Sequence, residues 1–596
     1  MSDYAVLVFD ETEPTAARAA QRRLEKGGWR VSHESPGFRV LSAGARVLPH
    51  WLSADRSTLV LGDLFGAPRL DPGDTPARFC ERLLTKAWGR YVVVARDPAG
   101  ALVGVFRDPS STLDAVIWRA EGFSIIASEF PAALGDLARG LQIDWRTIGA
   151  SLVDPLVLAS ACGVAGLETV TPGAIRTFDA ASSTETLLWR PSRFARRRRP
   201  DDAGSRAELV GVIDDCIEKL CGLGGSVIAE LSGGLDSSIV GAALARAPSA
   251  RVVQWLHFYI DDPAGDERPY AQAMASKLGV RLTQARKPPG RLDHDAIGDF
   301  AFGAKPSWRV VDGAYDRDLA DRAASLKASR IMTGLGGDTV FMQGADTWLG
   351  ADALACGHGS WLPRVARFAQ RSVYEIARKA LLETLGVQPP LIPPRAAWLS
   401  PATLDAGRRA RPHPWIEDLS GVSVPKRQQI LGLAHTLMIH GRSRRTAVAD
   451  VVSPLMSQPV MELCLSLSAI AQTGAGDDRA MARAAFGDRL APQIQARRSK
   501  AGYGAYYGRM VAQDLPALRD LLLDGMIASA GLIDGDGLDH LLSADTLVRQ
   551  GPYREILNLV VLEHWARSWR DLDGAGGGAG GGTRGRARAE RLIQEG

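Results

Sequence analysis

Short apolar runs separated by Gly, Pro and Asp dominate the first third of the chain. This spacing predicts many strands joined by turns rather than helices before about residue 190. The runs that carry the prediction are residues 4–9, 58–61, 91–95, 101–106, 115–118 and 123–127. We therefore expect a β-rich domain over residues 1–195.

The pattern changes after about residue 206. Helical and strand-like segments now alternate, in the order 206–221, 226–231, 237–246, 252–259, 267–278 and 330–334. Such alternation predicts a parallel sheet with helices on both faces. From about 365 to 570 the periodicity is mostly helical. The expected fold class is α/β, with a second domain over residues 206–572 that ends in a helical region.

Two segments differ in composition from these domains. Residues 191–205, PSRFARRRRPDDAGS, combine prolines with an arginine run and are interpreted as a solvated basic hinge. Aromatic residues do not repeat within this segment, as they would in a single-strand nucleic-acid site. Residues 573–596 are Gly-rich and are expected to form a flexible tail.

Overall composition excludes several classes of protein. The formal net charge of +4 is near neutral for 596 residues, so it gives no argument for nucleic acid or a membrane surface. Six cysteines are scattered without a CxxC pair, which is typical of reduced thiols. No apolar run is long enough for a membrane helix, and no signal peptide is apparent. We expect a cytoplasmic protein.

One loop carries the clearest chemistry. The stretch ELSGGLDSSIV, residues 230–240, leaves an apolar run and enters a small-residue helix through Gly233 and Gly234. Backbone N–H groups and the helix dipole at such a turn favour a phosphate group. The Walker signature is absent, because the chain contains no Gly-Lys dipeptide. Asp236 instead places a carboxylate beside the phosphates, which requires a bridging cation such as Mg²⁺.

A second loop supplies a partner for Asp236. The stretch TGLGGD, residues 333–338, follows the third predicted strand of this domain and ends in Asp338. Taken alone, GLGGD is most often a tight turn. In a parallel sheet, however, ligands bind outside the carboxyl ends of the strands, where both loops would lie. The two stretches together therefore predict a phosphate and Mg²⁺ site.

These motifs resemble the pyrophosphate-binding ATP enzymes (PP-loop ATP pyrophosphatases), specifically the asparagine-synthetase-like branch. SGGLDSS is followed by GxGxD, and further stretches match the branch in order. These are DERPYAQAMASKLG (266–279), SPLMSQPVMELCLSLS (453–468) and RRSKAGYG (497–504). In the first domain, GRYVVVARDPAGALVGVFRDP followed by ASEFPAAL is similar to the family's glutaminase domain, which has an Ntn-hydrolase-like αββα fold.

The resemblance implies cleavage of ATP between its α- and β-phosphates and formation of an amide from an acyl-adenylate. Ser232, Gly233, Gly234, Ser237 and Gly334 would hold the ATP phosphates, and Asp236 and Asp338 would bind Mg²⁺. Lys500, which matches the family's R-x-K-x-G-F segment, would stabilise charge during acyl transfer. A lysine beside several arginines is, without that match, more often a surface charge.

The first domain departs from the family pattern. Glutamine-using relatives carry a cysteine directly after the initiator methionine, whereas this chain begins Met1-Ser2 and its first cysteine is Cys80. The family's NGEIYN loop is replaced by LGDLFG, residues 61–66. Ser2 is a conceivable N-terminal nucleophile. We expect instead a degenerate amidotransferase domain that makes no ammonia, so that the amine belongs to the substrate.

Two groups of this branch lack the cysteine, the β-lactam-forming synthetases and the lasso-peptide cyclases. Leu335 stands where asparagine synthetases have Glu and β-lactam formers have Tyr, and Ser457 and Val452 replace a usual Asp and Arg. The closest resemblance is to the cyclases, which join a core peptide's N-terminal amine to an Asp or Glu side chain. The partners implied are a precursor peptide, a leader peptidase and a leader-recognition protein.

Three alternatives remain open from the sequence. One is an asparagine-like or β-lactam-type amide synthetase that uses ammonia or a substrate amine. Another is a non-catalytic scaffold that binds a peptide, although such a protein has no physical need for Asp236, Asp338 and Lys500 together. The third is a tRNA-modifying or sulfur-inserting enzyme, which the first-domain resemblance and the missing cysteine pair oppose.

Overall fold

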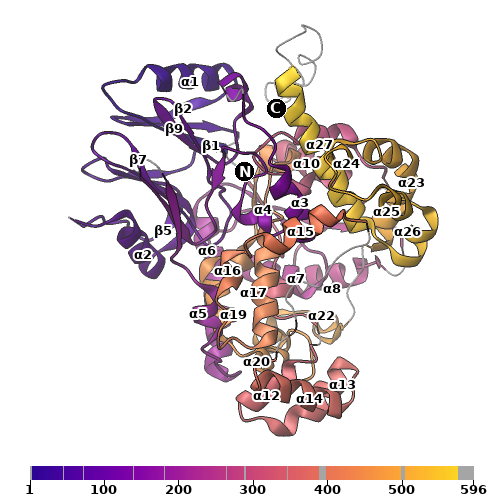
Figure 1. The fold of residues 1–596 in the computed structure, drawn as a ribbon. Coiled ribbons are helices and arrows are strands. Elements are labelled where there is room, and N and C mark those ends of the chain that lie inside the picture. Colours follow the sequence, from indigo (N-terminus) through magenta and orange to yellow (C-terminus); the bar gives the residue numbers. More distant parts are fainter. Residues whose placement is uncertain are drawn as a thin grey trace.

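The computed structural model describes residues 3–574, apart from 45, 72, 138–139, 180–181, 263–264, 288–289, 345, 388, 390–397 and 499–503. Figure 1 shows a β-rich N-terminal part and a larger, mainly helical remainder built around a parallel sheet. This is the mixed α/β architecture expected from the sequence. No helix among the described residues is both long and apolar enough to span a membrane.

The N-terminal part contains two six-stranded antiparallel sheets. The first has the order β10-β8-β9-β1-β3-β2 and the second β12-β11-β7-β6-β5-β4. The strands of the first sheet are β1 Asp3–Val8, β2 Arg30–Ser35, β3 Phe38–Ala43, β8 Val116–Ala120, β9 Phe123–Ala127 and β10 Glu168–Thr169. Those of the second are β4 His50–Leu52, β5 Thr58–Phe65, β6 Trp88–Arg96, β7 Leu102–Arg107, β11 Ala174–Phe178 and β12 Ser183–Leu187.

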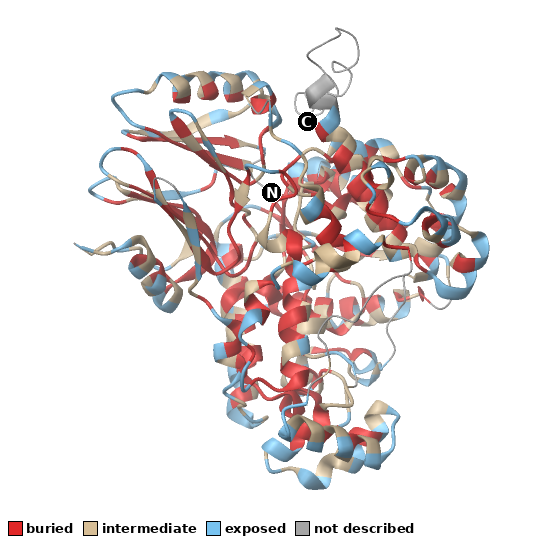
Figure 2. Ribbon diagram, in the orientation of Figure 1, coloured by how far each residue is buried: buried red, intermediate tan, exposed pale blue. Residues whose placement is uncertain are grey.

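Alternating side chains produce four layers in this part. Along β1, Tyr4 and Val6 face the second sheet, whereas Ala5 and Leu7 face outward. Helix α1 (Thr15–Lys26) covers the outward face of the first sheet, and α2 (Pro76–Lys86) covers that of the second. The order helix, sheet, sheet, helix agrees with the αββα layering expected from the sequence. Figure 2 shows the central strands as largely buried and the outer faces of both helices as exposed.

The second part is organised by a five-stranded parallel sheet of order β15-β14-β13-β16-β17. Its strands are β13 Val227–Glu230, β14 Val252–Tyr259, β15 Leu282–Arg286, β16 Arg330–Met332 and β17 Asp450–Val452. Helices α6 (Ala203–Gly222) and α7 (Leu235–Leu244) cover one face, and α10 (Gly313–Ser325) and α18 (Arg444–Val448) cover the other. Consecutive strands joined by helices force this parallel arrangement.

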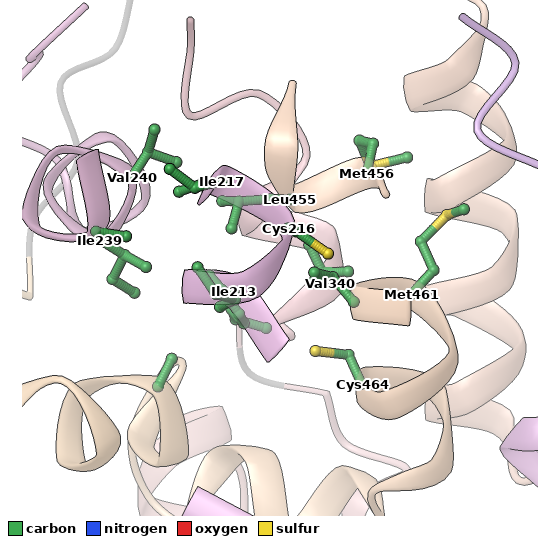
Figure 3. Packing of buried hydrophobic residues seen from close by; sticks show 14 of the residues in the cluster. Ile213, Cys216, Ile217, Ile239, Val240, Val340, Leu455, Met456, Met461 and Cys464 are labelled. Atoms are coloured by element: carbon green, nitrogen blue, oxygen red, sulfur yellow. The ribbon is translucent and has the colours of Figure 1, made fainter. Parts of the chain in front are cut away.

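Helices from residue 349 onward complete the fold. Figure 3 shows α6 and α7 packing beside Leu455, Met456 and the helix α19, which place the helical region against the sheet. The helices of this region include α12 Leu349–Ala355, α13 Leu362–Ala369, α14 Val373–Thr384, α15 Pro401–Arg409, α16 Pro414–Glu417, α17 Val424–Leu437, α19 Gln458–Ser466, α20 Ala469–Thr473, α21 Ala480–Ala485, α22 Pro492–Ala496, α23 Gly504–Leu522, α25 Gly535–Leu541, α26 Ala544–Gln550 and α27 Tyr553–Gly574.

The segment between the two parts differs from the solvated hinge expected from its composition. Residues Pro191–Ala195 form a short helix, α5, in which Pro191 and Ala195 are buried against α16 and α19. Arg196 donates to the Ser420 carbonyl and pairs with Asp418. Packing against distant helices therefore fixes Pro191–Ala195 in place, whereas Arg196 and Arg197 are exposed, as expected for a solvated basic segment.

A small cavity of about 70 Å³ lies between the two parts and is lined by the half-buried side chain of Glu129. Burial raises the pKa of Glu129 to about 7, against two backbone N–H donors from Ala304 and Phe130 that favour the charged form. The folded protein therefore keeps a proton that the unfolded chain releases above pH 4.5. The stability that this protonation supplies is lost as the pH rises toward 7.

Glu129→Gln is expected to unfold at the same urea concentration as the wild type at pH 4.5 and to be more stable by about 2–3 kcal/mol above pH 7.5. The reason is that glutamine has no proton to release. Urea unfolding across this pH range measures the difference. Exposed Glu121→Gln serves as the control and should follow the wild-type curve. A constant offset at every pH would contradict the prediction.

Candidate active site

The loop between β13 and α7 is held by its own serines. The hydroxyl of Ser237 accepts from the backbone N–H of Ser232 at 3.0 Å, and the two hydroxyls lie 2.8 Å apart. The Ser232 hydroxyl also accepts from Gly234 N–H at 3.2 Å. Gly233 adopts φ +79°, and a Cβ there would lie 2.6 Å from the backbone nitrogen of Ala271. A side chain would therefore separate the loop from the helix α8 (Arg268–Leu278).

The second loop directly contacts the first. A Cβ on Gly334 would lie 2.5 Å from the backbone nitrogen of Ser237, and one on Gly337 would lie 2.4 Å from the Asp236 side chain. Gly336 has φ +91° and begins the short helix Gly337–Val340, whose first turn carries Asp338. Glycines are required because the two strand ends approach each other this closely. The structure thus brings together the two motifs singled out in the sequence.

Arg479 joins the two acidic residues. Its Nη1 lies 3.1 and 3.2 Å from the carboxylate oxygens of Asp236 and 2.8 Å from that of Asp338. Its Nη2 pairs with Asp478 at 2.8 Å. Burial alone would lower the pKa of Arg479, but the neighbouring carboxylates of Asp236, Asp478 and Asp338 raise it above the ordinary value. The guanidinium is charged and occupies the space between Asp236 and Asp338.

The same two carboxylates suit Mg²⁺. Carboxylate oxygens are the ligands that this hard cation prefers, and Asp236 and Asp338 already converge on one cationic group. Water and phosphate oxygens would complete its coordination, since no group of three His, Cys, Asp or Glu converges on a metal position anywhere in the part of the chain described. The donor set fits an ion that arrives with phosphates.

Further arginines line the phosphate end of the site. Arg497 pairs with Glu267 at 2.7 Å, donates to the Gly233 carbonyl at 3.1 Å and stacks its guanidinium 4.2 Å from the ring centre of Tyr270. Glu267 therefore holds an arginine at the loop. Arg497 begins the RRSKAGYG stretch singled out in the sequence, although no role was assigned to it there, and Arg479 carries no recognisable motif of its own.

A cavity of about 340 Å³ connects these residues to the opposite face of the sheet. The predicted site residues Ser232, Gly234, Asp236, Ser237, Gly334 and Asp338 all line it, and Gly233 lies in the same loop. The interdomain cavity, at about 70 Å³, is much too small for a nucleotide. Lys500 lies outside the described residues, and Arg497, three positions earlier, lines the cavity.

The aspartate of the LGDLFG stretch in the first domain, Asp63, belongs to a cluster of ion pairs. Asp63 is buried and pairs with both Arg46 and Arg90. Arg46 also reaches Asp450 of β17 at 3.1 Å, so the cluster crosses to the second part of the chain. The opposing charges of Arg90 and Arg46 hold the pKa of Asp63 below its ordinary value, against burial, which raises it. Asp63 is therefore committed to a structural ion-pair cluster.

Gly334→Ala tests the contact between the two loops. The added Cβ must displace the backbone of Ser237, so we expect nucleotide affinity to fall at least about tenfold while the fold is retained. Calorimetric titration with ATP and Mg²⁺ and a circular dichroism spectrum measure the two effects. Gly211→Ala is the matched control, because its Cβ would meet no atom within 4 Å. Equal affinities of the two variants would contradict this reading of the loop.

A family model described as asparagine synthase matches residues 209–567, more than half of the chain. The chain belongs to the asparagine synthase family. This family comprises ATP-dependent ligases that form amide bonds, and the matched residues include both loops of the cavity. The match includes the sheet, both loops and α17 to most of α27.

Other comparisons add little to the asparagine synthase assignment. No curated protein matches the chain. The solved allosteric regulatory enzyme of purine biosynthesis is 10% identical with a TM-score of 0.19, over 48% of this chain and 81% of that one. The glutamine phosphoribosylpyrophosphate amidotransferase from B. subtilis, complexed with ADP and GMP, is 10% identical with a TM-score of 0.18, over 56% and 90%.

Proposed function

We propose that this member of the asparagine synthase family is a lasso-peptide cyclase. It would adenylate an Asp or Glu side chain of a core peptide and join that carboxyl to the peptide's N-terminal amine as an isopeptide bond. The observation that carries the proposal is the Asp63 cluster. Its ion pairs fill the part of the first domain where the family's glutamine-binding loop would lie.

A domain that makes no ammonia leaves the amine to the substrate. Asp63 is engaged by Arg46 and Arg90, and Cys80 is buried inside α2, where burial raises its pKa well above the ordinary value. A protonated, enclosed thiol cannot act as a nucleophile. This supports an N-terminal domain that serves as a scaffold, with the reacting amine supplied by the peptide itself.

The walls of the cavity support a substrate other than free aspartate. Leu335 lines the cavity at the position where its relatives place Glu or Tyr, and leucine can neither donate nor accept a proton. Ser457 begins α19 and is buried, so it offers no carboxylate to an amino-acid ammonium group. A carboxyl group carried by a peptide needs no such recognition, since the rest of the peptide can supply the binding energy.

In the first step, adenylation of the substrate carboxylate, different residues of the chain would bind different groups of ATP. A substrate carboxylate oxygen attacks the α-phosphorus of ATP, and the bond from that phosphorus to the bridging oxygen of pyrophosphate breaks. Backbone N–H groups at the start of α7 and the hydroxyls of Ser232 and Ser237 would hold the leaving pyrophosphate. Arg479 would move from the two carboxylates to the phosphates. Mg²⁺ bound by Asp236 and Asp338 would neutralise the charge that grows on the leaving group.

In the second step the peptide amine attacks the acyl carbon, the bond to AMP breaks and the amine loses a proton. We assign Lys500 to stabilise the negative charge on the acyl oxygen and on the departing AMP. The match to the family's R-x-K-x-G-F segment supports this role. The partners that we propose are the precursor peptide, a leader peptidase and a leader-recognition protein.

The test is a reaction of the purified protein with ATP, Mg²⁺ and a core peptide that begins with glycine. AMP release together with loss of one water from the peptide mass, both abolished in Asp236→Ala, would establish the cyclase. The reaction is repeated with the partner peptidase added. AMP formed only with a small amino acid would instead identify a small-molecule amide synthetase, and no AMP under either condition would overturn the proposal.

A further inference from the structure

The cavity does not end at the phosphate loop. Successive residues of β13 point to opposite faces of the sheet, so Val227, Ala229 and Leu231 face α6 and α7, and Ile228 faces α10. The same alternation places Glu230 on the α10 face, although the loop that follows turns into α7 on the other face. The cavity therefore crosses over the end of β13 from one face to the other.

Apolar groups line the cavity on the α10 face. Leu319, Ile331 and Val451 belong to one hydrophobic cluster and also line the cavity, with the ring of Tyr315 packed beside them. A ligand whose phosphates lie at Asp236 and Asp338 would extend over the strand end toward these side chains. Aliphatic side chains and a tyrosine ring beside a few polar groups suit an aromatic heterocycle.

The carboxyl of Glu230 lies among these walls, and the side chains of Arg309 and Arg445 also line the cavity. One of its oxygens accepts from the Tyr315 hydroxyl at 2.7 Å. No described lysine or arginine lies within ion-pair distance of it, although Arg445, Lys287 and Arg309 act on it from further away. Burial raises the pKa of Glu230, and these cations and the Tyr315 hydrogen bond oppose that effect. Among the described residues the carboxyl has one partner, which leaves it able to accept from a ligand.

Tyr315 is held in place on three sides. The Arg445 guanidinium lies 4.6 Å from the centre of its ring, the Lys287 ammonium lies 5.0 Å away, and the edge of Phe258 packs at 4.9 Å. Arg445 is itself fixed by Asp316 at 3.2 Å. A clamped hydroxyl that donates to Glu230 fixes the direction of the free oxygen of the carboxyl.

We propose that Glu230, oriented by Tyr315, reads position 6 of the purine, accepting a hydrogen bond from the exocyclic amino group of adenine. This inference rests on the proposed use of ATP by the cavity. A purine with oxygen at position 6, such as guanine or hypoxanthine, would place two acceptors against each other. Glu230 is thus a specificity residue for the nucleotide and takes no part in the transfer of the acyl group.

The experiment compares ATP with ITP, whose base differs from adenine at position 6 by an oxygen and a protonated N1. Dissociation constants are measured by calorimetric titration of the full chain in the presence of Mg²⁺. The wild type should prefer ATP by about tenfold or more. In Glu230→Gln the amide can accept from an amino group or donate to an oxygen, so ITP should bind more tightly and the preference should fall to about unity. A gain in ITP affinity cannot result from misfolding.

Two further variants sharpen the result. Tyr315→Phe keeps the ring but removes the donor, so the preference for ATP should fall about threefold as the carboxyl loses its orientation. Glu267→Gln lies at the other end of the same cavity, beside the loop between β13 and α7. It should raise the dissociation constants of ATP and ITP by the same factor and leave their ratio unchanged.

The outcomes separate this inference from the proposed function. A wild type that binds neither nucleotide overturns both. A wild type that binds ATP and ITP equally, or a Glu230→Gln variant with the wild-type ratio, overturns the inference alone. Loss of peptide cyclisation in Glu230→Gln with an unchanged nucleotide ratio would also overturn it, and would place the carboxyl at the reacting amine instead.

Discussion

Replacement of Asp236 by alanine is expected to abolish ATP-dependent AMP release, with a loss of at least about 10²–10³-fold. The carboxylate is half-buried beside the phosphate loop and shares Arg479 with Asp338, so its removal deletes one of the two oxygen donors that suit Mg²⁺. The fold should survive, because Arg479 keeps Asp338 and Asp478 as partners. AMP release at saturating ATP and the thermal midpoint are the two measurements.

Asp215→Ala is the matched control for this loss. Asp215 is an exposed aspartate that pairs with Lys219 one helical turn away, and its removal should leave AMP release unchanged. An Asp236→Ala variant with more than a tenth of the wild-type rate would contradict the assignment of the cation to this carboxylate. A rate lost together with the fold would assign Asp236 to structure instead.

The second large effect is expected in stability. Asp63→Asn removes the charge that Arg46 and Arg90 share, and leaves both guanidiniums facing the single carboxylate of Asp450. Breaking a buried pair by removing one partner costs about 3–5 kcal/mol, because the remaining charge stays desolvated. Urea unfolding followed by tryptophan fluorescence should show the transition at a clearly lower midpoint.

Asp418→Ala provides the comparison. This substitution breaks an exposed ion pair, in which the side chain of Asp418 is 51% accessible and that of Arg196 is 36% accessible. The free energy of unfolding should therefore fall by less than about 1 kcal/mol. Similar losses in the two variants would show that the Asp63 cluster contributes no more than a surface pair. The ion pairs of Asp63 would then no longer support the proposal that the first domain has lost glutaminase activity.

Local pattern was sufficient to predict the elements that build the site. The strand expected over 252–259 coincides with β14, and the strand and helix on either side of the phosphate loop were placed within two residues. Strong apolar runs bounded by glycines specify such elements without help from distant residues. Gly334 was expected inside a strand, but β16 ends at Met332, because the close approach of the two loops requires a turn there.

Contacts between distant residues could not be predicted. Arg479 lies 243 positions after Asp236, and nothing in its neighbourhood distinguishes it from other arginines. The pairing of Glu230 with Tyr315 likewise depends on where α10 crosses the sheet. The solvated hinge expected over 191–205 was wrong for Pro191–Ala195, since burial of Pro191 and Ala195 is decided by α16 and α19. Sequence pattern identifies segments, whereas their partners are set by tertiary packing.

The position of Arg479 has a consequence for the order in which ligands enter. With its guanidinium between Asp236 and Asp338, Arg479 already offsets part of the negative charge of these two carboxylates. A divalent ion that arrives alone must displace an internal cation and gains no phosphate in return, so free Mg²⁺ should bind weakly. When the ion arrives bound to ATP, Arg479 can pair with the phosphates while Asp236 and Asp338 bind the ion. The site thereby admits metal and nucleotide as a single ligand, and depletion of metal should leave the resting protein intact.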